Sequence, residues 1–175
     1  MQTELFEHGI FAENSDIRAH VAPGTRSVYV CRTQLLQDHI RLNPDKYRIV
    51  GAGQIGVAGQ TSKGYAVVWS EIPDIRRIRW DSGRWWERFS QNDSTTTKGK
   101  KACGVVGDLL RLGRFPLWYV QPAVDSKVVS LQHKGTDLLL CDQWRIQVKC
   151  DWNAGEGGTG NLYIETHERN PLRRH

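Results

Sequence analysis

The pattern of apolar and polar positions predicts strands in the first half of the chain. Residues 27–31 and 65–69 are short apolar runs typical of strands, and residues 47–50 predict another. Residues 1–25 are mixed and polar and predict no element. The apolar positions after the Ile72-Pro73 break lie in a basic setting that favours neither a helix nor a strand.

A helix is expected between the strands at residues 27–31 and 47–50. Apolar positions recur at Leu36 and Ile40, and Asn43-Pro44 stops the pattern. Thr33 precedes the pattern and is expected to cap the helix with its hydroxyl.

The second half predicts one helix followed by a run of strands. From residue 98 the apolar positions of a helix line one broad face until Gly113, namely Ala102, Val105, Val106, Leu109, Leu110 and Leu112. Strands are predicted over residues 117–120, 137–141, 144–150 and 161–165. Residues 90–97 are polar and predict a loop, which is the clearest internal boundary. This order predicts an α/β fold.

Length and composition add general limits to this pattern. A chain of 175 residues with 39% hydrophobic and 25% charged residues is typical of one globular domain with an elaboration. No apolar run approaches the roughly 20 residues of a membrane span, and the start of the chain does not resemble a signal peptide. The four cysteines form no CxxC pair. We therefore expect a cytoplasmic protein with reduced cysteines and no membrane partner.

The net charge of +5 is concentrated in the middle of the chain. Residues 76–114 hold 10 basic and 4 acidic side chains, while the segments on either side are nearly neutral. Aromatic residues are interleaved with this charge: Trp80, Trp85, Trp86 and Phe89. Basic and aromatic side chains together favour binding of nucleic acid, although a solvated basic surface has the same composition. The candidate DNA-binding residues are Arg76, Arg77, Arg79, Arg84, Arg88, Lys98, Lys100 and Lys101.

A glycine motif at residues 51–56 offers a different function. It matches the GxGxxG fingerprint of dinucleotide-binding proteins, and Glu71 follows at a suitable distance. However, residues 59–64 interrupt the helix that this motif must open, and no further βαβ units follow. A glycine-rich loop explains the same residues, so nucleotide binding is a weaker hypothesis.

Residues 135–150 carry the most specific chemistry. They predict a β-hairpin with its turn near Asp142-Gln143. On its second strand Gln147 and Lys149 point to one face, and the alternate residues Ile146, Val148 and Cys150 point into the core. Asp137, the Gln147 amide oxygen and the Val148 carbonyl are candidate ligands for a divalent cation. Lys149 would orient water or stabilise charge on a phosphate.

Thr136-Asp137 and Gln147-Val148-Lys149 resemble the two halves of the signature of PD-(D/E)XK nucleases, which have a restriction-endonuclease-like fold. The chain departs from the usual pattern in having glutamine where most members have glutamate. A QxK form is known in a bacterial homing endonuclease. Because glutamine is neutral, the departure implies a weaker metal site.

The resemblance extends over residues 97–168. The helix from Lys98-Gly99 to Gly113 and the strand at residues 161–165 are similar to elements of archaeal Holliday junction resolvases. In that comparison Cys103 stands where the resolvases have a glutamate ligand. Asp108 lies on the same helix but is turned away from that position, and Glu165 is the other candidate for the missing acid. His133 and His167 lie near these elements and are possible phosphate contacts.

The resemblance implies an α/β fold with a restriction-endonuclease-like mixed β-sheet flanked by helices. Residues 90–175 would form the nuclease core, and residues 1–89 an N-terminal DNA-recognition elaboration. The expected activity is site-specific hydrolysis of double-stranded DNA with Mg²⁺ or Mn²⁺, by a homing or restriction type of endonuclease. Cutting both strands implies a homodimer or a higher homo-oligomer. The alternatives are a Holliday junction resolvase and a non-catalytic DNA-binding module with a degenerate nuclease fold.

Overall fold

A computed structural model describes residues 5–7, 9–51, 62–79, 84–115, 128–130, 137–152, 154 and 160–169. It contains ten strands: β1 (Leu5–Glu7), β2 (Ile17–Ala22), β3 (Ser27–Arg32), β4 (Arg48–Gly51), β5 (Ser62–Val68), β6 (Arg76–Arg79), β7 (Val128–Ser130), β8 (Leu138–Leu140), β9 (Trp144–Cys150) and β10 (Asn161–Arg169). The α-helices are α1 (Thr33–Leu42), α2 (Arg84–Glu87) and α3 (Thr95–Arg111). Short 3₁₀ helices are η1 (Gly9–Ala12), η2 (Pro23–Thr25) and η3 (Trp69–Glu71).

The strands form two sheets. The larger has six strands in the order β6-β3-β2-β9-β8-β7, and the smaller has four in the order β1-β10-β5-β4. Neighbouring strands are antiparallel except for β2 and β9, which are parallel at the centre of the larger sheet. The expected α/β class, with a mixed sheet flanked by helices, is therefore confirmed.

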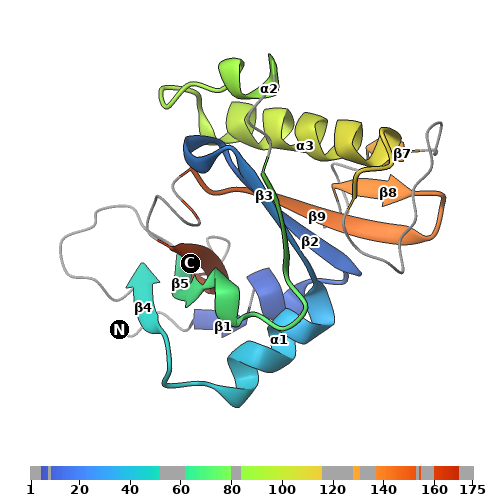
Figure 1. Cartoon of the computed structure of the whole chain (residues 1–175). Coiled ribbons are helices and arrows are strands. Elements are labelled where there is room, and N and C mark those ends of the chain that lie inside the picture. The colour runs from blue at the N-terminus through green and yellow to red at the C-terminus, as the bar shows by residue number, and fades with distance from the viewer. Residues whose placement is uncertain are drawn as a thin grey trace, which may run out of the picture.

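Figure 1 shows α3 along one face of the six-stranded sheet, with α1 and the four-stranded sheet on the other side. One apolar core lies beneath α3, where Val105 and Leu109 meet Ile17, Val28 and Ile146. A second core lies on the opposite side and joins side chains of β3, α1, β5 and β10: Tyr29, Cys31, Leu36, Ile40, Val67, Leu162 and Ile164. The larger sheet is thus covered on both faces.

Several sequence predictions are confirmed with shifted boundaries. The strands at residues 27–31, 47–50 and 144–150 and the first helix are present. Two boundaries were wrong. Thr33 is the first helical residue and not the cap, because its hydroxyl bonds to Ser15 and not to the helix. The second predicted helix is α3, and it begins at Thr95, inside the expected loop. The Ser94 hydroxyl caps it there because it accepts a hydrogen bond from the Thr97 N–H.

The largest omission concerns residues 1–25 and 76–80. Residues 17–22 form the central strand β2, and residues 76–79 form the edge strand β6. Both sheets combine strands from before and after residue 90, so residues 1–89 and 90–175 share each sheet. The roles assigned to these two regions stay predictions. Some of the predicted features lie outside the described residues, namely the strand at 117–120, His133, Thr136 and residues 52–56 of the glycine motif.

Candidate functional site

The face of β2 and β9 that points away from α3 is polar. In β2, Ile17 and Val21 pack in the core beneath α3, and the alternate residues Arg18 and His20 point to the opposite face. All six residues of β2 are buried. Arg18 and His20 are therefore charged or titratable groups in a fully covered strand, an expensive arrangement that marks candidate functional positions.

The parallel register aligns this polar face with the predicted QxK residues. Arg18 lies opposite Gln147, and His20 lies opposite Lys149. Ile146 and Val148 are buried in the core beneath α3, as expected from the alternation. The sheet thus carries four polar side chains on one face at its centre.

Arg18 is held by two side-chain contacts. Its Nη1 lies 2.9 Å from Glu13 Oε1, in an ion pair whose side chains are almost entirely buried. Its Nε donates to His20 Nε2 at 2.9 Å. Burial lowers the pKa of His20 well below its ordinary range, and the positive charges of Arg18 and Lys149 lower it further. His20 is therefore neutral at physiological pH.

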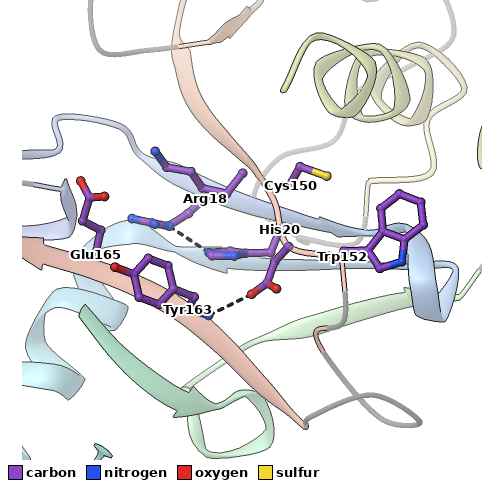
Figure 2. A pocket seen from close by; sticks show the side chains of 8 residues that line it. Arg18, His20, Cys150, Trp152, Tyr163 and Glu165 are labelled. Atoms are coloured by element: carbon purple, nitrogen blue, oxygen red, sulfur yellow. Dashed lines mark hydrogen bonds between the residues drawn. The ribbon is translucent and has the colours of Figure 1, made fainter. Parts of the chain in front are cut away.

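A cavity of about 210 Å³ opens above His20, between the two sheets. Figure 2 shows side chains from β2 and β10 converging on it. Asp151, just after β9, is tied to β10 because its Oδ2 accepts from the Tyr163 N–H at 2.9 Å. Burial raises the pKa of Asp151, although this hydrogen bond opposes the shift. The lining residues are Arg18, His20, Lys149, Cys150, Asp151, Trp152, Tyr163 and Glu165.

Asp137 contacts the QxK strand directly. Its backbone N–H donates to the Ile146 carbonyl at 3.1 Å, and its Oδ2 accepts from the Val148 N–H at 2.8 Å. Because the N–H and C=O of one residue in an antiparallel ladder point to the same edge, the Val148 carbonyl points to the same edge of β9 as its N–H. Asp137 directly precedes β8, whose pairing with β9 begins at Leu138 and Ile146.

Gln147 contributes an unusual acceptor. Its Oε1 is buried and has no hydrogen-bond partner among the described residues. Most buried polar atoms are satisfied, so an orphaned acceptor at this position calls for an explanation. A hard cation, or a hydrogen-bond donor of a ligand, would be a partner for this oxygen.

Cys103 on α3 lies close enough to Asp137 to interact with it electrostatically. Burial raises the pKa of Cys103 to about 12, and the negative charge of Asp137 contributes to the shift. Without a bound cation, Cys103 is therefore a neutral thiol. Asp108 is engaged on the surface of α3, where Arg111 Nη1 lies 3.4 Å from its Oδ1.

The predicted site residues fall into two groups. Asp137 meets the strand at Val148, whereas Lys149 and Glu165 share the cavity, whose lining does not include Asp137 or Gln147. Among the described residues, no three His, Cys, Asp or Glu side chains are grouped so that they could hold a metal ion. For His167 the structure describes only the strand backbone, in β10.

The predicted DNA-binding residues are also divided. Arg76, Arg77 and Arg79 belong to the edge strand β6, where Arg76 pairs with Asp74 and Arg77 Nε donates to Ser27 Oγ. Arg84 is exposed on α2, and Lys98 lies with its Nζ 5.6 Å from the centre of the Trp152 ring.

A basic groove separates α2 from α3. We use this name for a cavity of about 400 Å³ whose lining includes the predicted residues Arg88, Lys100 and Lys101. Arg111 adds a fourth cation and Asp108 one anion, while aromatic and small residues complete it: Trp85, Phe89, Gly104 and Val105. Lys101 Nζ binds Asp93 Oδ2 at 2.6 Å. The groove adjoins α3, whereas the 210 Å³ cavity lined by His20 and Lys149 lies on the opposite side of the six-stranded sheet.

Sequence reasoning missed Arg18 and His20. The signal that would have found them is the strict alternation in Ile17-Arg18-Ala19-His20-Val21, which is typical of a strand with one apolar face. Their partnership with Gln147 and Lys149 has no local signal, because it arises from strands far apart in the chain.

Comparisons with protein-family models, with curated proteins and with solved structures found nothing that matches this chain. No helix in the described part of the chain has both the length and the apolar character needed to cross a membrane. Any function must therefore be argued from the site itself.

Proposed function

We propose that this protein is a Mg²⁺- or Mn²⁺-dependent DNA endonuclease of the homing or restriction type, with a restriction-endonuclease-like core. The observation that carries the proposal is the 2.8 Å hydrogen bond from the Val148 N–H to Asp137 Oδ2. It fixes the predicted acid against the predicted Gln147-Val148-Lys149 strand, as the arrangement of a PD-(D/E)XK site requires.

The donor atoms of Asp137, Gln147 and Val148 are of the kind that a hard divalent cation binds. Asp137 uses one carboxylate oxygen for Val148, which leaves Oδ1 for a metal. The orphaned Gln147 Oε1 and the Val148 carbonyl are neutral oxygen donors of the kind that Mg²⁺ accepts. These three residues would hold the cation, and Glu165 is proposed as a further acid. When bound, the cation supplies Lewis-acid activation of water and neutralises phosphate charge.

The protein's own residues would position the DNA backbone. Lys149, on the same face as Gln147, would place its ammonium beside the phosphate and stabilise the negative charge that develops there. The basic groove lies on the opposite side of the six-stranded sheet from Lys149, so it and the arginines of β6 would supply cations for more distant phosphates of the DNA. Cleavage of both strands would need a second copy of the site, and we propose a homodimer or a higher homo-oligomer for this reason.

A non-catalytic DNA-binding module is the second candidate. The described residues contain no group of three acidic, histidine or cysteine side chains that could hold a metal ion. The helix position that would supply another acid is occupied by the neutral thiol of Cys103. In this alternative the basic groove binds DNA and the Asp137 region is structural. A junction resolvase would use the same residues on branched DNA.

Cleavage assays with matched variants distinguish these functions. Purified protein is incubated with supercoiled and four-way junction DNA, with Mg²⁺, with Mn²⁺ and with EDTA. We expect metal-dependent cleavage that falls at least about 100-fold in Asp137→Asn and Lys149→Met, as for loss of a charge-stabilising group. Asp137→Asn keeps an oxygen that can accept from Val148, so it removes mainly the charge.

Asp16→Asn is the matched control. Asp16 Oδ2 also accepts a hydrogen bond from a backbone N–H of β9, that of Arg145 at 2.8 Å. This contact lies at the start of β9, away from Lys149. This variant should cleave like the wild type. DNA binding without any metal-dependent cleavage would support the non-catalytic module and overturn the proposal.

A further inference from the structure

The hydrogen bond between Arg18 and His20 fixes the tautomer of the histidine. A guanidinium has only donors, so Arg18 Nε must donate and His20 Nε2 must accept. A neutral imidazole with an accepting Nε2 carries its proton on Nδ1. His20 therefore presents an Nδ1–H donor on the polar face of β2.

This donor has no acceptor. His20 Nδ1 is buried and makes no hydrogen bond with the described residues. Leaving such a group unsatisfied is unfavourable, so it is rarely retained without a function. Because His20 lines the cavity, an oxygen entering from that side is the partner that the geometry allows.

Lys149 adds an uncompensated positive charge at the same place. It lies opposite His20 on the neighbouring strand and lines the same cavity. Its ammonium makes no ion pair with any residue that the structure describes. The nearby Arg18, by contrast, is already neutralised by Glu13.

We propose that His20 Nδ1–H and Lys149 Nζ together form an oxyanion site that binds a phosphoryl oxygen. The proposal rests on the proposed function for the identity of the ligand, which would be a phosphodiester of DNA. His20 would then bind one oxygen of the phosphate directly, and Arg18 would be the positioning residue that sets its orientation. A donor and a cation that converge from adjacent strands suit an oxyanion better than a neutral ligand.

The acidic groups of the cavity do not prevent this. Asp151 faces β10, where the Tyr163 N–H occupies its Oδ2. Glu165 comes from the opposite wall, on β10, and has an interaction of its own. Since His20 has no exposed surface, the oxygen reaches its Nδ1 only when side chains that line the cavity move outward.

Nitrogen NMR of ¹⁵N-histidine-labelled protein tests the proposal in EDTA, where no cleavage occurs. One sample receives inorganic phosphate, and another receives the dinucleotide thymidylyl-thymidine, so that free phosphate and phosphodiester are distinguished. We expect His20 to show the Nδ1–H tautomer and its Nδ1 resonance to move on titration, with the phosphodiester binding more tightly. His39, whose Nε2 is bonded to the Tyr47 hydroxyl, serves as the internal control.

Substitution of Lys149 provides a second measurement. Lys149→Met should weaken binding of the dinucleotide about tenfold, as for loss of one hydrogen bond to a charged group. Lys46→Met is the matched control, because Lys46 pairs with Glu71 away from the cavity. An Nε2–H tautomer, or an unmoved His20 resonance at saturating ligand, would overturn the oxyanion site. Because both readouts work in EDTA, the site can hold even if the protein cleaves nothing, and cleavage can occur even if the site fails.

Discussion

Cys103 on α3 and Asp137 before β8 are electrostatic neighbours. Burial, and after it the negative charge of Asp137, raises the pKa of Cys103 to about 12. In Asp137→Asn the pKa of Cys103 should fall, although burial keeps it above its ordinary value. The pH dependence of iodoacetamide labelling, followed by mass spectrometry, measures this. Cys150, whose raised pKa comes from burial and other neighbours, should be unchanged, and an equal shift at both cysteines would contradict the contact.

Restoring the acid of the common nuclease pattern should strengthen metal binding. Gln147→Glu adds a negative charge to an oxygen that now lacks a partner. We expect Mg²⁺ or Mn²⁺ to bind at least about tenfold more tightly, because affinity rises with the number of charged ligands. Isothermal titration with Mn²⁺ measures the change. Weaker or unchanged binding would show that Gln147 does not contact the metal.

The buried Glu13–Arg18 pair should matter greatly for stability. In Glu13→Gln a buried guanidinium loses its counter-charge, and removing one member of such a pair costs about 3–5 kcal/mol. Urea unfolding measures the free energy of unfolding. The control Glu71→Gln breaks the exposed pair with Lys46 and should cost at most about 1 kcal/mol. Similar losses in both variants would contradict a special role for Arg18.

The basic groove can be tested at Gly104. An added Cβ there meets no atom within 4 Å, so Gly104→Glu places a negative charge in the groove without a clash. We expect the affinity for double-stranded DNA to fall about tenfold at low salt, where charges are least screened. Gly99→Glu, on the same helix with equally open space but outside the groove lining, should have a smaller effect. Equal losses would indicate a dependence on net charge alone.

Asp151 should make stability depend on pH. Burial raises its pKa above the ordinary value of 3.8, so the folded state holds this proton more tightly than the unfolded state. The contribution is present below that ordinary value and is lost as pH rises through the raised pKa. Asp151→Asn, which keeps an acceptor for the Tyr163 N–H, should be more stable than the wild type at pH 7 but not at pH 3. Thermal unfolding at both pH values measures this, and a constant difference would contradict it.

The sequence predicts the elements whose pattern is continuous. Residues 144–150 alternate without interruption, and the apolar face of α3 repeats for several turns, so both elements were found. The central strand β2 was missed because Arg18 and His20 made its segment look merely polar. Only tertiary structure explains these residues, since their partners are Glu13 and the far strand β9.

The sequence also predicted part of the placement of the candidate site residues. Lys149 and Glu165 do line one cavity, and Asp137 does contact the strand of Gln147. No local pattern could place His20 beside Lys149, because parallel pairing of distant strands leaves no trace in the spacing of either. The catalytic and metal-binding roles of these residues stay predictions.

The parallel pairing of β2 and β9 also has a consequence for how the chain folds. The hydrogen bond from the Arg145 N–H to Asp16 joins residues 129 positions apart, at the centre of the larger sheet. During synthesis β2 can pair with β3 at once, but its other neighbour, β9, exists only after most of the chain has been made. Closing so large a loop is slow, and we expect fragments that end before residue 144 to leave the β9 side of β2 as an open, aggregation-prone edge.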